Sequence, residues 1–229
     1  MEIKSTYSDT VVFIDFDGTV ALLDTNVELV SKYGNDETML YEEKFIKGEL
    51  PNRIVIQKHY QTMRLTPETY YETVHSLPLD PGFLSFYRTA KHYGIPISIL
   101  SGSIREGIGS YLARHSVTGI DVFGNNMSVT DGVIVFEPVD EIFQTYCGNG
   151  LCANCKSKHL VKARNEGKTT IYIGDGLTDL CAARYADTLY AKATLADYCQ
   201  ENNIPFIRFY NFYDVYRHFF GMEPGYEES

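Results

Sequence analysis

One short segment of the chain restricts its fold more than any other: residues 11–14 are apolar and mostly β-branched (VVFI), and they lead directly into DFDGT, which contains Asp15 and Asp17. Such a run is typical of a strand buried on both faces of a parallel sheet. Because buried carboxylates are costly without a cation or hydrogen-bond donors, two acids at its end indicate a catalytic or metal site. Side chains two residues apart point to the same side of a strand, so both acids can share that site. A surface turn, the simpler interpretation, would need only one Asp-Gly pair.

Composition narrows the classes of protein that fit. The chain has 229 residues, enough for one large domain or for one domain that carries an insertion. Its net charge is −10 and no segment is rich in lysine or arginine, which argues against nucleic acid or an anionic membrane surface as a partner. No apolar stretch reaches about 18 residues, so we expect no membrane span. Five cysteines without a secretion signal predict a cytoplasmic protein with reduced thiols.

The segment after DFDGT has helical patterns and no convincing strand. We expect four helices in it, over residues 22–33, 36–47, 51–63 and 67–76. Pro51 and Pro67 fit the first turn of a helix, where a missing N–H costs nothing. The pattern predicts a helical-bundle cap over residues 22–78, inserted into a core made of residues 1–21 and 79–229.

In the rest of the chain, strands alternate with helices. Further strands are expected at residues 95–100, 121–123, 169–173, 188–191 and 205–209. Helices are expected at residues 81–93, 104–115, 156–165, 179–185, 195–202 and 212–220. Residues 127–136 alternate around Thr130-Asp131-Gly132, which predicts a β-hairpin. The alternation predicts an α/β fold with a doubly wound, mostly parallel, Rossmann-like sheet.

Three of the predicted strands end in polar or acidic residues, namely Asp15 with Asp17, Ser101 with Gly102, and Asp175 with Asp179. Ligands of open parallel sheets bind beyond the C-terminal strand ends, so these residues should converge. Clustered carboxylates repel one another unless a hard cation neutralises them, and Mg²⁺ prefers oxygen ligands. Gly102 lets backbone N–H groups approach an anion beside the hydroxyl of Ser101. The sequence therefore predicts a Mg²⁺ site that also binds an anion.

Four motifs follow one another along the chain: DFDGT, a strand-end serine, a lysine and GDGLTD. Their order resembles that of the haloacid dehalogenase superfamily of phosphohydrolases, over nearly the whole chain. A closer likeness lies in Cys147-x4-Cys152-x2-Cys155-Lys156 followed by IYIGDG at residues 171–176. It is similar to the branch that holds the 2-hydroxy-3-keto-5-methylthiopentenyl-1-phosphate phosphatases and the phosphoethanolamine/phosphocholine phosphatases. Phosphoserine phosphatases are more distant members with a similar helical cap.

The resemblance implies a role for each acid. Asp15 would be the nucleophile that forms an aspartyl-phosphate. Asp17 would protonate the leaving alkoxide and then activate water; such a carboxyl must hold a proton near neutral pH, which crowding by other carboxylates favours. Asp15, the backbone carbonyl of Asp17 and Asp175 would hold Mg²⁺, while Asp179 would orient these ligands.

The resemblance also implies that Lys156 binds phosphate together with Ser101 and Gly102. An exposed lysine at a helix start is the simpler interpretation, and Lys158 is the competing lysine. Asn125 follows a predicted strand, as a substrate-binding asparagine does in the family. A turn asparagine before a hairpin fits that position equally well.

The cysteines before Lys156 allow a second metal. Cys147, Cys152 and Cys155 have a spacing close to that of zinc ligands, with His159 or Cys181 as the fourth. Because no second CxxC is present, we favour reduced thiols that pack a loop beside the site.

The cap is expected to exclude water and to select the leaving group. Phosphoserine phosphatases hold their substrate with a glutamate and an arginine; here Asp24 takes the first position, and an ungapped match puts His59 at the second. Arg53 or Arg64 could replace the arginine from nearby turns. Without it the phosphoserine assignment weakens, because a bidentate arginine is not easily replaced. Asp24 is a candidate substrate contact that fits a helix N-cap equally well.

Together these features predict a Mg²⁺-dependent phosphomonoester hydrolase of a small phosphorylated metabolite, most similar to the methylthiopentenyl phosphatase branch. Phosphoserine, phosphoethanolamine, phosphocholine or pyridoxal phosphate are alternative substrates. A phosphotransferase and a receiver-like module phosphorylated on aspartate are alternative functions. The aromatic residues 210–220 predict an amphipathic helix docked on the sheet, with a homodimer as a further option.

Overall fold

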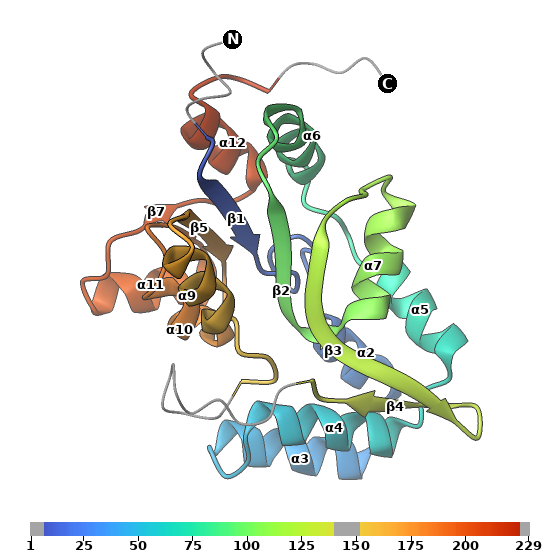
Figure 1. Ribbon diagram of the computed structural model, residues 1–229. Helices are drawn as coiled ribbons and strands as arrows, with labels where there is room; N and C mark the ends of the chain where they lie inside the picture. The colour runs from blue at the N-terminus through green and yellow to red at the C-terminus, as the bar shows by residue number, and fades with distance from the viewer. Residues whose placement is uncertain (1–6, 140–151, 225–229) are drawn as a thin grey trace.

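A seven-stranded sheet in the order β4-β3-β2-β1-β5-β6-β7 forms the centre of the computed structural model, which describes residues 7–139 and 152–224 (Figure 1). The strands are β1 (Thr10–Ile14), β2 (Ile97–Ile104), β3 (Asp121–Thr130), β4 (Val133–Glu137), β5 (Thr169–Gly174), β6 (Thr188–Ala191) and β7 (Ile207–Arg208). All neighbouring strands are parallel except β3 and β4. The predicted α/β class is confirmed.

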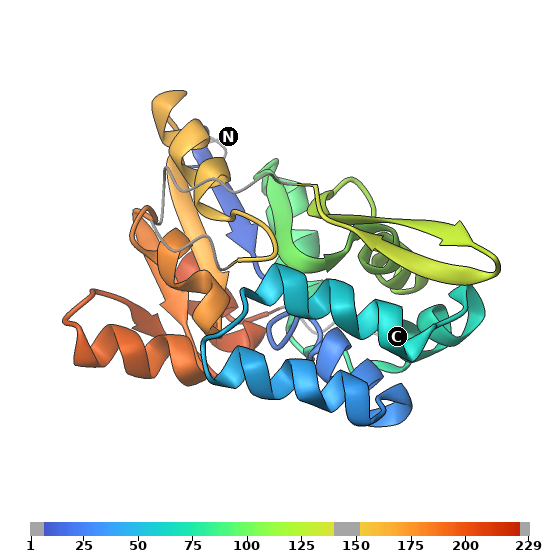
Figure 2. The ribbon, with the colours of Figure 1, turned by 90° about the horizontal axis from the view of Figure 1, so that it is seen from below.

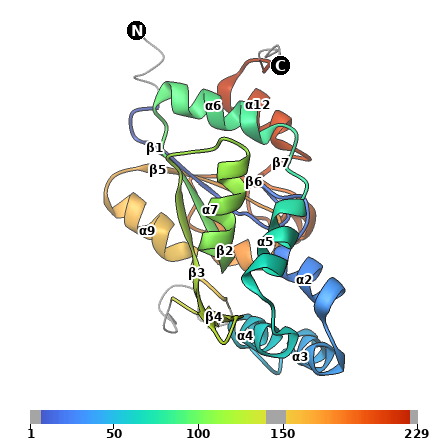
Figure 3. The same ribbon diagram turned by 90° about the vertical axis from the view of Figure 1, so that its right-hand side faces the viewer.

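Helices cover both faces of this sheet (Figure 3). Because successive side chains of β1 point to opposite faces, this strand contacts both helical layers. Val12 and Ile14 pack into one core with helices α6, α7 and α12, whereas Phe13 packs into a second core with α9, α10 and α11. The bounds are α6 (Phe83–Tyr93), α7 (Arg105–Arg114), α9 (Ser157–Asn165), α10 (Leu180–Ala183), α11 (Ala193–Glu201) and α12 (Phe212–Phe220). Buried on both sides, β1 places its C-terminal end at the centre of the molecule.

The remaining helices lie beyond the C-terminal ends of β1, β2 and β5, as Figures 1 and 2 show. They are α2 (Thr25–Tyr33), α3 (Asp36–Ile46), α4 (Asn52–Met63) and α5 (Pro67–Ser76). Seen from below, α3 and α4 cross this end of the sheet side by side (Figure 2). We propose that residues 22–78 form the cap and that residues 1–21 and 79–229 form the core.

The β3–β4 hairpin reaches from the sheet edge to the helices of this region. The backbone N–H of Ile134 donates to the carbonyl of Leu65 at 2.8 Å, and the rings of Phe136 and Tyr60 stack with centroids 5.4 Å apart. Phe136 and Tyr60 are both buried. The sequence predicted the hairpin but gave no sign of this second attachment.

Several boundaries differ from the sequence predictions for local reasons. Helix α2 begins at Thr25 rather than at residue 22, because Asp24 is its N-cap and accepts a hydrogen bond from Val27 N at 2.9 Å. Strand β3 is continuous where a short strand and a separate hairpin arm were predicted. It pairs in parallel with β2 at its start and antiparallel with β4 at its end, so its backbone is paired almost throughout.

The helical segment predicted over residues 179–185 lies two residues earlier in the structure, at residues 177–183. It starts as the 3₁₀ turn η1 (Leu177–Asp179) and continues as the short helix α10. No helix in the described part of the chain is long and apolar enough to span a membrane.

The hairpin attachment leads to a stability prediction. Replacing Phe136 with alanine removes a buried ring from the contact with Tyr60 and should lower the free energy of unfolding by about 3–5 kcal/mol. Val135→Ala in the same strand is the matched control, because Val135 is 39% exposed and should change stability by less than about 1 kcal/mol. Urea unfolding followed by circular dichroism measures both; equal effects would contradict the attachment.

Candidate active site

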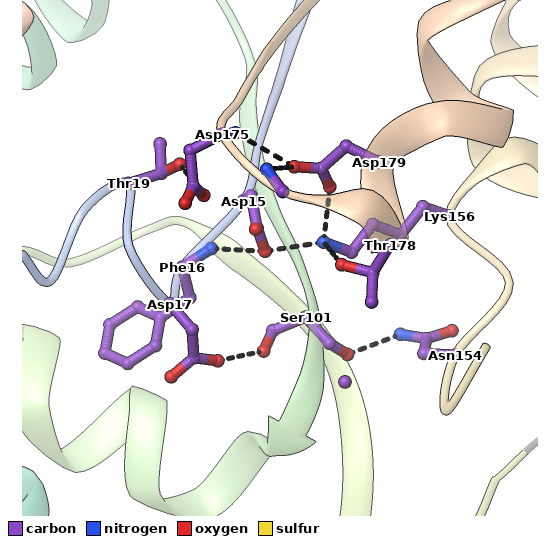
Figure 4. A network of polar contacts seen from close by, with 12 residues as sticks. Asp15, Phe16, Asp17, Thr19, Ser101, Asn154, Lys156, Asp175, Thr178 and Asp179 are labelled. Carbon is purple, nitrogen blue, oxygen red and sulfur yellow. Dashed lines mark hydrogen bonds and ion pairs between the residues drawn. The ribbon is translucent and has the colours of Figure 1, made fainter. Parts of the chain in front are cut away.

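Loops at the C-terminal ends of β1, β2 and β5 meet at one point, as the sequence predicted (Figure 4). β1 supplies Asp15 and Asp17, β2 supplies Ser101, and β5 supplies Asp175. Carboxylate oxygens of Asp15, Asp175 and Asp179 lie within 4.8 Å of one another. Residues far apart in the sequence thus form one acidic cluster.

Lys156 lies inside this cluster and joins two of its acids. Its Nζ is 2.6 Å from Asp15 Oδ1 and 2.7 Å from Asp179 Oδ1, and all three side chains are buried. Burial disfavours the charge of Lys156, but the two carboxylates outweigh it and raise the pKa of the ammonium above its usual value. Lys156 is therefore a permanent cation, and the interpretation as an exposed helix-start lysine is wrong.

One cation does not balance three carboxylates. Burial raises the pKa of Asp15 well above its usual value, and the charge of Asp179 adds to this more than Lys156 offsets. Burial and the charge of Asp179 likewise raise the pKa of Asp175 to about 6, although Thr19 donates to its Oδ1 at 2.8 Å. The cluster carries more negative charge than its protein partners neutralise, which is the condition for binding a cation.

Four hydrogen bonds occupy the carboxylate of Asp179. It accepts hydrogen bonds from Lys156, from the Tyr172 hydroxyl and from the backbone N–H groups of Asp175 and Gly176. These bonds fix the loop after β5 and the position of Lys156. Asp15 and Asp175 therefore remain as the side chains best suited to hold a divalent cation, and their oxygen donors fit Mg²⁺.

Gly18 is needed for the close approach of the first and third loops. Its φ is +76°, and a Cβ atom built there would collide with the carboxylate of Asp175. The glycine of DFDGT is thus required both by its left-handed backbone and by its neighbour.

Asp17 accepts hydrogen bonds on both oxygens. Thr25 donates to Oδ1 through its backbone N–H, at 2.9 Å, and through its hydroxyl. The hydroxyls of Ser101 and Ser103 donate to Oδ2 at 2.9 and 2.7 Å. These bonds fix the carboxyl at the boundary between β1 and α2. The sequence analysis missed Ser103, although the repeated hydroxyl in Ser101-Gly102-Ser103 could have revealed it.

A cavity of about 500 Å³ opens from the cluster toward the helices α2, α3 and α4. It is lined by Asp15, Asp17, Asp24, Asn26, Val27, Glu42, Phe45, Asn52, Val55, Ile56, Gly102, Ser103, Lys156, Asp175, Gly176, Leu177, Thr178 and Thr194. Asp24 keeps contact with solvent, but the surrounding walls and the charge of Asp17 raise its pKa to about 7. Asp24 is thus both the N-cap and a lining residue.

Two predicted binding residues lie behind the cavity wall. Ser101 is buried beneath Ser103, and its hydroxyl is directed at Asp17. Asn125 is also buried; its amide donates to Gly102 O at 2.7 Å and accepts from Val139 N at 3.2 Å. A similar bond to this loop comes from Asn154, which donates to Ser101 O at 2.9 Å and which no sequence motif had indicated.

Other candidates from the sequence lie away from the cavity or outside the described structure. Arg53, Arg64 and Lys158 are absent from its described lining. Cys147 lies outside the described residues, so the favoured interpretation of reduced thiols and the zinc alternative both stay predictions there. The metal-ligand group found in the described ranges, 7–139 and 152–224, is that of Asp15, Asp175 and Asp179.

Comparison with known proteins decides the family. Residues 10–196 match the family model described as Putative Phosphatase. The chain belongs to this family. Two curated relatives are similar to this chain over most of its length. A 2-hydroxy-3-keto-5-methylthiopentenyl-1-phosphate phosphatase of Brevibacillus brevis is 29% identical to it, over 90% of this chain and 93% of the relative. A polyol phosphate phosphatase of Saccharomyces cerevisiae is 28% identical over 90% of each chain.

Solved structures support the same fold for this member of the Putative Phosphatase family. A substrate-bound phosphoserine phosphatase superposes with a TM-score of 0.70 at 18% identity, over 92% of this chain and 98% of the other. The predicted membership of a phosphatase family and the predicted phosphoserine-phosphatase-like fold are confirmed, and so is the predicted enzyme class, a phosphomonoester hydrolase.

The contact at Gly18 predicts a specific instability. Gly18→Ala should lower the free energy of unfolding by more than Gly132→Ala, because both have positive φ but a Cβ at Gly132 meets open space. We expect about 1–3 kcal/mol for Gly132→Ala from backbone strain, and about 1–3 kcal/mol more for Gly18→Ala from the collision with Asp175. Urea denaturation compares the two variants; a smaller loss at Gly18 would contradict the close approach.

His59, a fully buried residue of α4, predicts a pH dependence of stability. Burial lowers the pKa of its imidazole to about 4 in the folded protein, against an ordinary value near 6.5. Between these values the unfolded chain binds more protons, so stability should fall as pH drops from about 6.5 toward 4. His59→Gln should reduce that slope in unfolding curves measured across this range, whereas replacing the exposed His92 should leave it unchanged.

Proposed function

We propose that the chain hydrolyses a small phosphomonoester through a phosphorylated Asp15, with Mg²⁺ as cofactor. The observation that carries this proposal is the arrangement of the buried Asp15 and Lys156 with the half-buried Asp175 at the floor of a cavity lined by helices. Bound Mg²⁺ would neutralise the excess negative charge and orient a phosphate group for in-line attack. Asp15, Asp175 and the backbone carbonyl of Asp17 are the proposed ligands.

The two carboxylate oxygens of Asp15 have different surroundings and therefore different proposed roles. Lys156 Nζ and the backbone N–H of Phe16 bind Oδ1, the latter at 2.7 Å. The oxygen left to attack phosphorus is therefore Oδ2. Attack forms the O–P bond of the aspartyl-phosphate and breaks the bond to the alkoxide leaving group. Lys156 stays beside Oδ1, where its charge also attracts the phosphate oxygens.

Asp17 is the proposed general acid and base. It would give a proton to the leaving alkoxide and then accept one from the water that attacks the aspartyl-phosphate. The Ser103 hydroxyl, which donates to Asp17 Oδ2, also lines the cavity. A hydroxyl can rotate and reverse its hydrogen bond, so Ser103 can accommodate either protonation state of Asp17.

The proposed substrate is a small phosphorylated metabolite of the cytoplasm, of the class processed by 2-hydroxy-3-keto-5-methylthiopentenyl-1-phosphate phosphatases. The support is the similarity to those enzymes over 90% of this chain. Residues 22–78 would act as the cap that excludes water during turnover. The polyol phosphate phosphatase relative makes a hydroxylated leaving group the second candidate.

The assignment of the nucleophile leads to a direct test. Asp15→Asn should lower kcat for p-nitrophenyl phosphate at least about a thousandfold, because an amide cannot form the aspartyl-phosphate. Asp197→Asn, at a surface ion pair with Arg208, is the matched control and should retain full activity. Removal of Mg²⁺ with a chelator should abolish turnover, and added Mg²⁺ should restore it.

Two results would contradict the proposal. Full activity of Asp15→Asn would exclude this nucleophile. Persistence of a trapped phospho-Asp15 for hours in the wild-type protein would indicate a phosphorylated signalling module in place of a hydrolase.

A further inference from the structure

Helices α2, α3 and α4 each contribute one polar side chain to a cluster beside the cavity: Asn26, Glu42 and His59. The Asn26 side-chain amide nitrogen is 3.1 Å from His59 Nδ1, and Glu42 Oε2 is 3.4 Å from His59 Nε2. Asn26 and Glu42 line the cavity, whereas His59 lies fully buried behind them. The mechanism described above uses none of the three residues.

The chemistry of this cluster fixes the tautomer of His59. The amide nitrogen of Asn26 can only donate, so Nδ1 must accept and the proton of the neutral ring is on Nε2. Nε2 lies 3.4 Å from Glu42 Oε2 and makes no hydrogen bond with the described residues, so its N–H interacts with the carboxylate as a nearby dipole. If the Asn26 amide were reversed, its oxygen would accept a hydrogen bond from Nδ1, and Nε2 would carry no proton. The lone pair of Nε2 would then face the Glu42 carboxylate, which is unfavourable.

Glu42 receives no counter-charge from His59 in this arrangement, and its partial burial raises the pKa of its carboxyl above the ordinary value. A neutral histidine positions the carboxylate without neutralising it, and burial lowers the pKa of His59 to about 4. Lys156 is the one lysine or arginine among the described residues that line the cavity, and it is bound to Asp15 and Asp179. Among the described lining residues, the end of the cavity away from Lys156 therefore has an acceptor, Glu42, and no lysine or arginine.

We propose that Glu42, positioned by His59, selects the leaving group by accepting a hydrogen bond from its ammonium or hydroxyl group and by repelling a carboxylate. The inference rests on the proposed function, because it concerns the alcohol that the hydrolysis releases. An unpaired carboxylate beside Glu42 would raise the energy of the complex through like-charge repulsion in a confined space. Val55 and Ile56 line the same region and suit an aliphatic portion of that alcohol.

Three small phosphomonoesters that differ in the polar groups of the released alcohol test this selection. Phosphoethanolamine carries an ammonium, phosphoserine carries the same ammonium with an added carboxylate, and glycerol 1-phosphate carries hydroxyls. We expect kcat/KM to be at least about tenfold higher for phosphoethanolamine or glycerol 1-phosphate than for phosphoserine. Comparison of the first two substrates distinguishes a cationic from a neutral donor.

Charge variants at Glu42 have matched controls at the next residue. Glu42→Gln should reduce the preference over phosphoserine about tenfold, and Glu42→Arg should reverse it by supplying a partner for the carboxylate. Glu43→Gln and Glu43→Arg change the charge of an exposed residue that pairs with Lys47, and they should leave the preference unchanged. Each preference is measured relative to p-nitrophenyl phosphate, so that general losses cancel.

The positioning role of His59 has its own readout. Glutamine keeps a polar N–H group beside Glu42 and leucine does not, so the preference should largely survive in His59→Gln and fall in His59→Leu. The change should appear in KM for phosphoethanolamine rather than in kcat. Circular dichroism establishes that both variants are folded.

The outcomes separate this inference from the proposed function. If the protein hydrolyses p-nitrophenyl phosphate in an Asp15-dependent way but takes phosphoserine as readily as phosphoethanolamine and glycerol 1-phosphate, the role of Glu42 is wrong and the hydrolase remains. Identical preferences in the Glu42 and Glu43 variants would also overturn the role of Glu42. Absence of turnover with every phosphomonoester would instead contradict the proposed function.

Discussion

The rest of the site depends on one buried ammonium group, that of Lys156, which is shared between Asp15 and Asp179. Lys156 comes from the start of α9, Asp15 from the end of β1, and Asp179 from the turn after β5. A buried carboxylate without a partner is strongly destabilising, so these three segments cannot separate cheaply. The same ammonium binds one oxygen of Asp15 and thereby orients the other. Stability and reactivity at this point therefore have a common origin.

The sequence predicted the parts of the structure that follow from local chemistry. The helices α5 and α12 and the strand β6 occur at their predicted bounds, because proline, asparagine or clear apolar patterns mark their ends. The convergence of Asp15, Ser101 and Asp175 followed from a general property of parallel sheets. These predictions needed no knowledge of contacts between distant residues.

What the sequence could not supply depends on tertiary contacts. The attachment of the hairpin to α4 is made by Tyr60 and Phe136, each of which would have been simply a core aromatic in the sequence. Asn154 binds two backbone carbonyls that lie distant in the chain, and Ser101 faces Asp17 rather than the cavity. The tautomer of His59 required its neighbours on two other helices. Such roles are set by partners that sequence spacing does not reveal.

The β3–β4 hairpin has a mechanical consequence. Residues 22–78 connect to the sheet at a close pair of chain crossings, where Ala21 and Leu79 form an antiparallel bridge, and again at the hairpin through Leu65 and Ile134. A body held at two separate points keeps one free rotation, about the line that joins them, and its other rotations are restrained. Any rigid-body movement of residues 22–78 that preserves both attachments must therefore follow this single axis.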